Sequence, residues 1–348
     1  MSAPSLPIPT SLQEYLPLGL QDLEQLRLIL RGDSALDWTR LAVRNEAEAH
    51  QLLLLAGLDL SQEADVQHFK FIYEQALTYL DAYIHHFVQD EVRYLENPVD
   101  LLYLASQPGQ SQGDACILLK VMHVIYHVTG RELLFLLPIP IQELFHRIET
   151  RVFQAIDGMK ASGIQIFQFE GSRKTRSSIL TKLLCRSDSF AAEVHDRIRF
   201  RVITEDLESL FEALIYLSRH LFPFNYVLPG ESRNDLLDLE ATFSQDPYLA
   251  HFAKYLQPLP NSDGASNPYS AKGFKMINFV VDLPVRVDDV LEHVPGYSKR
   301  LGHTVFLLVE FQLVDRITHH SNSTGDNRHD LYKERQIKKV IERLTPGH

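Results

Sequence analysis

The spacing of apolar residues changes once along this chain, and that change limits the folds that the chain can adopt. From residue 12 to about residue 137, apolar side chains recur three and four positions apart, which is the period of amphipathic helices. From Ile164 onward, four segments show the two-residue period of strands, and helical segments lie between them. The sequence therefore predicts an α+β protein, in which a helical N-terminal domain is followed by a mixed β-sheet flanked by helices.

We place the division between the two parts after residue 138. Residues 1–138 form the predicted helical domain, and residues 139–348 form the predicted sheet domain, whose first helix ends at a capping glycine, Gly163. The four strands are predicted at IQIFQFE, RIRFRVIT, FKMINFVVDLPV and HTVFLLVEFQLVD. An additional segment, at about 229–266, lies between the second and the third of these strands.

The composition excludes several functional classes. Two cysteines are too few for a disulfide framework or a thiolate metal site. The N-terminal residues lack the basic and apolar regions of a signal peptide, and no apolar run is long enough to span a bilayer, so we expect a soluble cytoplasmic protein without a membrane partner. The formal net charge of −11 disfavours a broad nucleic-acid surface but permits a small anionic ligand.

Alternation along two strands brings acids and cations into one sheet. In the last strand, Glu310 and Gln312 point to the same face, opposite Phe311. In the second strand, alternation places Asp196 on the face opposite three arginines, which are Arg197, Arg199 and Arg201. Carboxylates from two strands with cations nearby suit magnesium-dependent phosphoryl transfer, because the acids hold the metal and the cations stabilise developing charge. A solvated sheet face gives the same pattern, so the spacing leaves both interpretations open.

Four blocks between Ile141 and Lys333 resemble, in order, the nucleotidyltransferase-like synthetase domain of RelA/SpoT-type (p)ppGpp synthetases. The blocks are SRKTRSSILTKLL, HDRIRFRVIT, NPYSAKGFKMINFVVDLPV and LLVEFQL, and the last is followed by RHDLYK. The resemblance implies a pyrophosphokinase of alarmone synthesis in the stringent response. Such an enzyme uses Mg²⁺ to transfer pyrophosphate from ATP to the 3′ hydroxyl of a guanine nucleotide such as GTP.

The resemblance also implies roles for the residues that match the family pattern. Asp196 and Glu310 would be the catalytic acids that ligate Mg²⁺, and Glu310 could instead act as the base that activates the acceptor hydroxyl. Of the other positions, Lys174 and Ser178 would contact the ATP phosphates, and Phe274 would stack on the acceptor base. The full set assigned to nucleotide binding is Lys174, Ser178, Lys182, Arg201, Phe274, Lys275, Asn278, Gln312 and His329.

The chain departs from the family pattern at several of its positions. Ser172 and Val314 stand where the family has arginines, and Arg173 would point the opposite way from Ser172 on an extended segment. Met276 and Asn278 stand where the family has serine and histidine. Two alternatives therefore remain. One is the same fold with another acceptor, an adenine nucleotide or, against the acidic net charge, the 3′ end of tRNA; the other is an inactive nucleotide-binding regulatory protein. A homo-oligomer is compatible with each of them.

Two histidines of the helical part, His123 and His127, lie one helical turn apart, which is a spacing suited to a metal ion. The sequence fixes no carboxylate or third histidine beside them, so a packed helix face is the favoured interpretation. Trp38, the only tryptophan of the chain, is predicted to pack where two helices meet.

Overall fold

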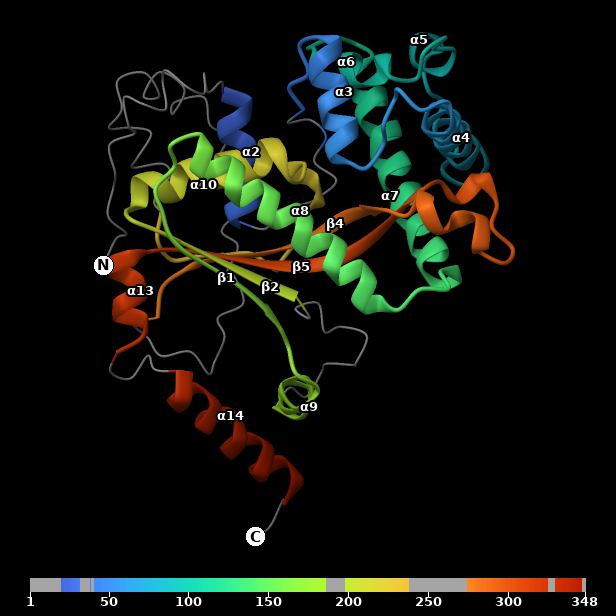
Figure 1. Cartoon of the computed structure of the whole chain (residues 1–348). Helices are drawn as coiled ribbons and strands as arrows, with labels where there is room; N and C mark the ends of the chain where they lie inside the picture. Colours follow the sequence, from blue (N-terminus) through green and yellow to red (C-terminus); the bar gives the residue numbers. More distant parts are fainter. Residues whose placement is uncertain are drawn as a thin grey trace.

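The computed structural model describes residues 20–31, 38, 41–185, 198–237, 274–324 and 329–345. In this part of the chain, helices surround a single five-stranded sheet (Figure 1). The predicted α+β fold class is therefore confirmed. None of the helices described combines the length and the apolar character that a membrane span requires.

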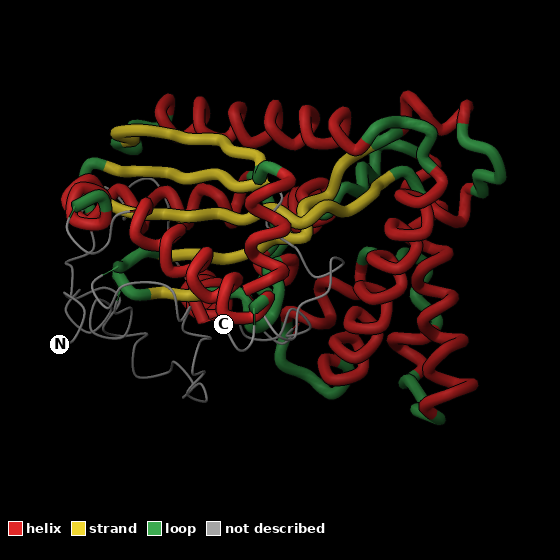
Figure 2. The backbone as a smooth tube through the Cα atoms, turned by 90° about the horizontal axis from the view of Figure 1, so that it is seen from below, coloured by secondary structure: helices red, strands yellow, loops and turns green. Residues whose placement is uncertain are grey.

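The N-terminal part is helical, as the period of its apolar residues predicts. Its elements are α2 (Leu20–Arg31), α3 (Glu46–Leu55), α4 (Glu63–Tyr79), the π-helix η2 (Leu80–Ile84), α5 (Asp90–Arg93), α6 (Asp100–Ser106) and α7 (Gln112–Leu136). Asn45 caps α3 by accepting a hydrogen bond from the Glu48 backbone N–H at 3.0 Å. Helices α3 to α7 gather at one end of the sheet (Figure 1, Figure 2), and α7 joins them to strand β5.

The C-terminal part contains the four predicted strands and one further short strand. Its elements are α8 (Ile141–Ala161), β1 (Ile166–Arg173), α9 (Arg176–Cys185), β2 (Ile198–Thr204), α10 (Leu207–His220), η4 (Phe224–Tyr226), β3 (Arg233–Asn234), β4 (Ile277–Arg286), η5 (Asp288–His293), η6 (Lys299–Leu301), β5 (Thr304–Asp315), α13 (Arg316–Asn322) and α14 (His329–Leu344). Gly163 follows α8 with a φ of +89°, which confirms the predicted cap. Most of the additional segment at 229–266 lies outside the described residues.

The sheet is mixed, and its strand order is β1-β2-β5-β4-β3. Strand β5 pairs in parallel with β2 and antiparallel with β4, and the two remaining pairs are antiparallel. The register sets Gln312 opposite Arg201 on one side and opposite Asn278 on the other. A shift of one residue would move every side chain of β5 to the other face, so this register fixes which residues can form a site.

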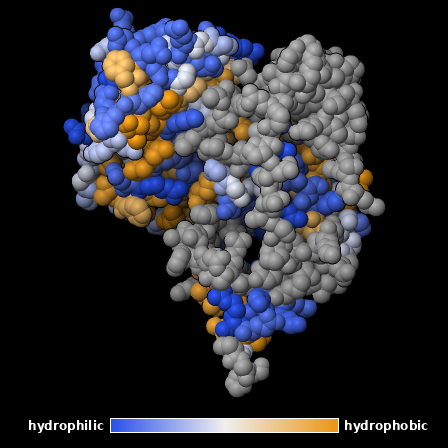
Figure 3. Space-filling view, turned by 180° about the vertical axis from the view of Figure 1, so that it is seen from behind, coloured by the Kyte–Doolittle hydropathy of each residue, from blue (hydrophilic) through white to orange (hydrophobic). Residues whose placement is uncertain are grey.

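One face of the sheet carries an aromatic core that α2, α8 and α10 cover. The ring centroid of Phe311 lies 5.9 Å from that of Phe200, 5.7 Å from that of Phe279 and 5.6 Å from that of Phe222. Buried residues of the helical part and of the sheet belong to one hydrophobic cluster, so no break in the core marks the division after residue 138. That division stays a prediction. On the surface seen from behind, hydrophilic side chains lie among hydrophobic ones over the described residues (Figure 3).

Helix α7 approaches the sheet closely because it carries a glycine at the contact. A Cβ atom added to Gly130 would lie 2.5 Å from two ring carbons of Phe306 and 3.0 Å from the Thr304 carbonyl oxygen. One turn earlier, His127 stacks on the same phenylalanine with a centroid distance of 4.1 Å. The absence of a side chain at Gly130 therefore permits the contact between the helical part and β5.

We predict that Gly130→Ala destabilises the protein although alanine favours helices. The clash with Phe306 should cost about 1–3 kcal/mol, which exceeds the gain in helix propensity of about 1 kcal/mol. Urea unfolding measures the effect. The control is Gly113→Ala in the same helix, where an added Cβ would meet nothing within 4 Å. A Gly130→Ala variant as stable as Gly113→Ala would contradict the packing.

A buried histidine in α4 makes the fold sensitive to acid. His68 is 2% exposed, and neither of its ring nitrogens has a hydrogen-bond partner among the described residues. Its ring packs between Phe71 and Tyr126, with centroid distances of 6.4 Å and 5.8 Å. Burial, with a smaller contribution from His303, lowers the pKa of His68 from 6.5 to about 4. His68 is therefore neutral in the folded protein at neutral pH.

Protonation of the unfolded chain should consequently weaken the fold in mild acid. The folded pKa of His68 lies below the unfolded value of 6.5, so this histidine leaves stability unchanged above that pH and reduces it as the pH falls toward about 4. The slope for one such group is at most about 1.4 kcal/mol per pH unit. In urea unfolding at several pH values, His68→Leu should reduce the slope, whereas His50→Leu, at an exposed position, should not. Equal slopes in wild type and His68→Leu would refute the assignment.

Candidate functional site

A row of polar side chains crosses the sheet on the face opposite the phenylalanine core. The register aligns one residue from each strand, in the order Glu170, Arg201, Gln312, Asn278 and Arg233. We call these five residues the polar row. The alternation predicted for β5 is thus observed, because Gln312 and Phe311 point to opposite faces. All five strands contribute one polar residue at this level, and β5 brings the residues of β2 and β4 together because it lies between these two strands.

Gln312 is the centre of the hydrogen bonds in the polar row. Its Oε1 accepts from Nε and Nη2 of Arg201 at 3.0 Å and 2.8 Å. Its Nε2 donates to Glu310 Oε1 at 2.9 Å and to Asn278 Oδ1 at 3.4 Å. Arg201 also lies 3.7 Å from a carboxylate oxygen of Glu170. The structure therefore brings four predicted site residues, Glu310, Gln312, Arg201 and Asn278, into one network.

Glu310 is the acid that the sequence predicts on β5, and it is 9% exposed. It opposes Arg199 in the register of β2 and β5. Whereas Oε1 accepts from Gln312, Oε2 is buried and has no hydrogen-bond partner within the described residues. A buried carboxylate oxygen without a donor is costly unless a cation or a ligand donor completes it. Glu310 Oε2 is thus an atom of this face that a cation or a hydrogen-bond donor could stabilise.

Two arginines of β2, Arg199 and Arg201, lie near each other on the face of Glu310. The Arg199 Nε donates to Ser172 Oγ at 3.2 Å, so Ser172 meets an arginine although it replaces one in the family pattern. Burial and then the charge of Arg199 lower the pKa of Arg201, and the two acids nearby only partly oppose this. Burial and Arg201 likewise lower the pKa of His319 on α13. Neighbouring guanidinium groups that repel each other favour an anionic ligand.

The residues predicted to bind the acceptor nucleotide lie just before β4 or at its start. Phe274 is half-buried, and its carbonyl oxygen accepts from Arg233 Nη2 at 3.4 Å. Lys275 has an exposed side chain and a fixed backbone, because its N–H donates to Asn322 Oδ1 at 3.1 Å and its carbonyl accepts from Asn322 Nδ2 at 2.7 Å. Sequence reasoning missed Asn322, which only the fold brings beside β4. Met276, at the position where the family pattern has a serine, is buried, and its thioether carries no hydrogen-bond donor.

The predicted phosphate-binding residues lie between β1 and α9. Lys174 follows the last residue of β1, and the Ser178 backbone N–H donates to Thr175 Oγ1 at 3.3 Å. The hydroxyl of Ser178 also lies 3.0 Å from Thr175 Oγ1. The structure thus places Ser178 in the first turn of α9, outside the polar row.

Other predicted site residues are not described. Asp196 lies outside the described residues, as do the side chains of Lys182 and His329. Glu310 shares a face with Arg199 and Arg201. Strand β2 begins at Ile198, two residues after Asp196, so the alternation of the described strand does not decide the face on which Asp196 lies. The convergence of the two acids on one metal therefore stays a prediction. The residues that the structure describes contain no group of three or more His, Cys, Asp or Glu side chains that could hold a metal ion.

Arg173 takes the orientation that the sequence predicts. Its Nε and Nη2 donate to the two carboxylate oxygens of Glu149 on α8, at 2.7 Å and 2.6 Å. The guanidinium carbon also lies 5.6 Å from the ring centroid of Phe145. Arg173 thus joins β1 to α8 on the core side, and it does not replace the arginine missing at Ser172.

The histidine pair of α7 is packed, and it has an acidic partner that the sequence did not reveal. The rings of His123 and His127 lie 4.3 Å apart. Asp282 of β4 accepts from Arg131 Nη2 at 2.8 Å and lies 2.9 Å from Nδ1 of His127. Because Asp282 is 155 residues from His127 in sequence, only the docking of α7 on the sheet brings them together.

Comparison with known proteins gives matches among solved structures only. No family model matches the chain, and no curated protein matches it. Small alarmone synthetase 2 from Bacillus subtilis is 12% identical, with 59% of this chain and 92% of that chain covered and a TM-score of 0.29. Small alarmone synthetase 1 from Bacillus subtilis, bound to its product pppGpp, is 14% identical, with coverages of 58% and 82% and a TM-score of 0.31.

A third similar structure is a GTP pyrophosphokinase family protein from Streptococcus pneumoniae. It is 14% identical to this chain, 58% of this chain and 87% of that chain are covered, and the TM-score is 0.28. These proteins are of the kind that the sequence motifs resemble. The likeness extends over somewhat more than half of this chain, and both its sequence identity and its TM-scores are low.

We predict that Gln312→Leu destabilises the protein by about 1–3 kcal/mol, because it leaves Glu310 Oε1 and the guanidinium of Arg201 without their shared partner. Urea unfolding at neutral pH measures the change. The matched control is Gln142→Leu at an exposed position of α8, where about 0.5 kcal/mol or less is expected. A Gln312→Leu variant as stable as this control would show that the network contributes nothing to folding.

Proposed function

We propose that this chain is a magnesium-dependent pyrophosphokinase that transfers the pyrophosphoryl group of ATP to the 3′ hydroxyl of a guanine nucleotide. The observation that carries the proposal is the buried Glu310 carboxylate, whose Oε2 lacks a partner within the described residues, on a face that also presents Arg199 and Arg201. The motifs described above supply the reaction type. Glu310, Arg199 and Arg201 would supply the charges that such a reaction requires.

One oxygen atom of the site, Glu310 Oε2, is suited to ligate a divalent cation. Glu310 Oε2 would ligate Mg²⁺ together with Asp196, while Oε1 stays bonded to Gln312. A magnesium ion held by these acids would supply positive charge that neutralises part of the phosphate charge. Gln312 holds the carboxylate of Glu310 and the guanidinium of Arg201 in fixed positions, so both are oriented before the substrate binds.

The arginines would act on the charge of the transferred group. Arg199 and Arg201 lie on one strand, on the face of Glu310, and both carry donors that fit phosphate oxygens. Phe274 offers a ring on which the purine of the acceptor stacks, and Asn322 holds the backbone beside it through Lys275. The ATP phosphates would contact Lys174 and Ser178, which precede and begin α9.

We predict that the purified protein transfers label from γ-labelled ATP to GDP or GTP in the presence of Mg²⁺. Glu310→Gln should reduce the rate at least about a hundredfold, because the amide keeps the shape of the side chain but ligates cations poorly. Asp196→Asn should reduce it similarly. Thin-layer separation of the products measures transfer. Glu292→Gln, at an exposed position of η5, makes the same chemical change elsewhere and should leave the rate unchanged.

The same assay is run with AMP, ADP and tRNA as acceptors, so that the alternative functions can be distinguished. Transfer to one of these alone would replace the guanine acceptor and retain the chemistry. Saturable binding of ATP without transfer to any acceptor would favour the nucleotide-binding regulatory protein. Transfer that Glu310→Gln leaves intact would contradict the proposed role of Glu310.

A further inference from the structure

A cluster of exposed side chains, most of them aromatic, lies on the helical part between the end of α4 and the end of α5. Tyr83, Phe87 and Tyr94 are 74%, 72% and 72% exposed, and Tyr79 and Ile84 are exposed as well. We call these five residues the aromatic patch. Helices α4 and α5, which flank it, lie at the opposite end of the molecule from α9 and α14 (Figure 1). Exposed apolar clusters of this kind mark interaction sites.

Contacts between side chains join the aromatic patch into one surface. The ring centroids of Tyr79 and Tyr83 lie 5.5 Å apart. The guanidinium carbon of Arg93 lies 5.2 Å from the ring centroid of Phe87, and Nη1 and Nη2 of Arg93 donate to the two carboxylate oxygens of Asp81 at 2.8 Å and 2.6 Å. Because Asp81 belongs to η2, this ion pair ties the loop of Phe87 to the helix that carries Tyr83.

The backbone beneath the aromatic patch is fixed, so the fold itself holds the rings outward. Asp114 of α7 accepts from the Gln89 backbone N–H at 2.9 Å and also lies 2.9 Å from Nε2 of His86. The Tyr73 hydroxyl of α4 donates to the Val92 carbonyl oxygen at 2.6 Å. A partner would therefore bind without first ordering this segment, which lowers the entropic cost of binding.

The turn before Phe87 has an unusual backbone. The π-helix η2 ends at His85, whose φ of +54° is the only positive value at a non-glycine residue in the part of the chain that the structure describes. The His86 backbone N–H donates to the Leu80 carbonyl oxygen at 3.2 Å and closes this turn. Short π-helices and left-handed residues other than glycine are uncommon, and both are frequent at functional sites.

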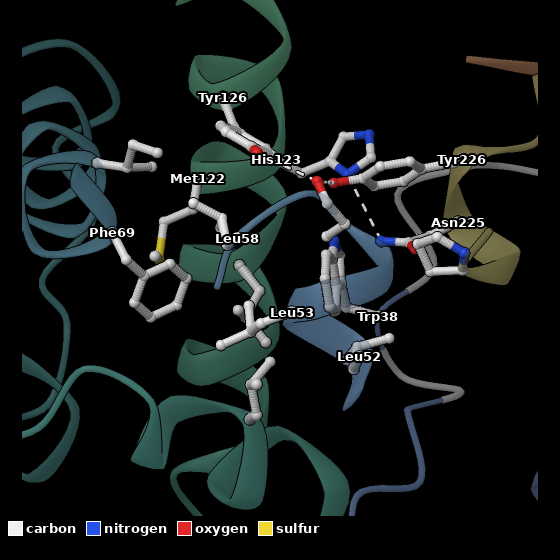
Figure 4. Close-up of a pocket in the computed structure, with 15 residues that line it drawn as sticks. Trp38, Leu52, Leu53, Leu58, Phe69, Met122, His123, Tyr126, Asn225 and Tyr226 are labelled. Atoms are coloured by element: carbon white, nitrogen blue, oxygen red, sulfur yellow. Dashed lines mark hydrogen bonds between the residues drawn. The ribbon is translucent and has the colours of Figure 1, made fainter. Parts of the chain in front are cut away.

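The buried faces of the same helices form a packed core that supports the aromatic patch. Phe69 of α4 and Met122 of α7 line a small apolar cavity inside the helical part (Figure 4). Trp38 lines the same cavity, and its ring centroid lies 6.1 Å from that of His123. Trp38 thus packs where helices meet, as the sequence predicts. Because this core lies within the helices, substitution of an exposed ring of the patch should leave the helical part folded.

The surface around the aromatic patch is acidic. Between Glu74 and Leu119 the sequence contains seven acidic residues and one basic residue, Arg93, which is already paired with Asp81. This region alone accounts for more than half of the formal net charge of −11. Carboxylates and the faces of aromatic rings both attract cations, whereas the carboxylates repel nucleic acids, anionic lipids and acidic proteins.

We propose that the aromatic patch binds a basic protein segment, in which arginine or lysine residues lie beside apolar ones. The cations stack on the rings of Tyr83, Phe87 and Tyr94 and pair with the surrounding carboxylates, while the apolar side chains of the partner cover Tyr79 and Ile84. The exposed rings provide the contact area, and the charge of the region selects a basic partner.

The test uses the full chain and, as the probe, a fluorescein-labelled peptide of alternating arginine and leucine, with fluorescence anisotropy as the readout. We expect saturable binding with a dissociation constant in the micromolar range, which weakens as the salt concentration rises. The same peptide with glutamate in place of arginine should not bind. Equal affinities for the two peptides, or no saturable binding of the arginine peptide, would overturn the proposal.

Variants with matched controls locate the binding surface. Phe87→Ser should weaken binding of the arginine peptide at least about tenfold without a change in charge, whereas Phe135→Ser, at an exposed position near the end of α7, should retain the affinity. Asp90→Asn should weaken binding about threefold, and Asp157→Asn, at an exposed position of α8, should not. Equal affinities of Phe87→Ser and Phe135→Ser would show nonspecific attraction to an acidic surface and would overturn the proposal.

Two further measurements detect other occupants of the aromatic patch. Sedimentation equilibrium should give the same mass for the unaltered chain and for Phe87→Ser, and neither should sediment with phosphatidylglycerol vesicles. An oligomer that Phe87→Ser dissociates would assign the patch to a second copy of the chain. Vesicle binding that Phe87→Ser abolishes would assign it to a membrane, and either result would overturn the proposal.

Discussion

The pairing of β5 along both of its edges is the constraint on which the rest of the structure depends. Residues 309–315 of β5 pair in parallel with β2, and residues 304–313 pair antiparallel with β4, so each side chain from Val309 to Leu313 has a fixed neighbour on both sides. One face of the strand then carries the phenylalanine core, and the other carries Glu310 and Gln312. Because the period of a strand is two, the same register that buries Phe311 also aligns Gln312 with Arg201 and Asn278.

Strand β4 connects the polar row with the helical part of the chain. Asn278 belongs to the row, and four residues later Asp282 holds His127 and Arg131 of α7. Gly130 allows α7 to reach β5 at the same place. Helix α7 therefore contacts both central strands. The helical part is thus packed onto the sheet by polar and apolar contacts between residues that are far apart in the sequence.

Much of the fold could be predicted because the spacing of apolar residues in the sequence matches the spacing of buried residues in the helices and strands. The four strands and the helices α8 and α10 follow from local alternation or from apolar stripes, and the faces of β5 follow from its alternation alone. The contacts that could not be predicted join residues that are far apart in the sequence. Asn322 clamps Lys275 across 47 residues, and Asp282 meets His127 across 155 residues, and neither partner has a local signal. The short strand β3 was also missed, since two residues carry no period. The predicted partnership of Asp196 with Glu310 is untested, because Asp196 lies outside the described residues.

The central claim is that Glu310 Oε2 ligates a divalent cation beside a bound nucleotide. The most direct test is a crystal structure of the chain grown with Mn²⁺ and a non-hydrolysable ATP analogue, in which the anomalous signal of manganese locates the ion. The account predicts an anomalous peak at coordination distance, about 2 Å, from Glu310 Oε2, with the phosphates facing Arg199 and Arg201. A nucleotide and metal bound elsewhere, with Glu310 still without a partner, would contradict it.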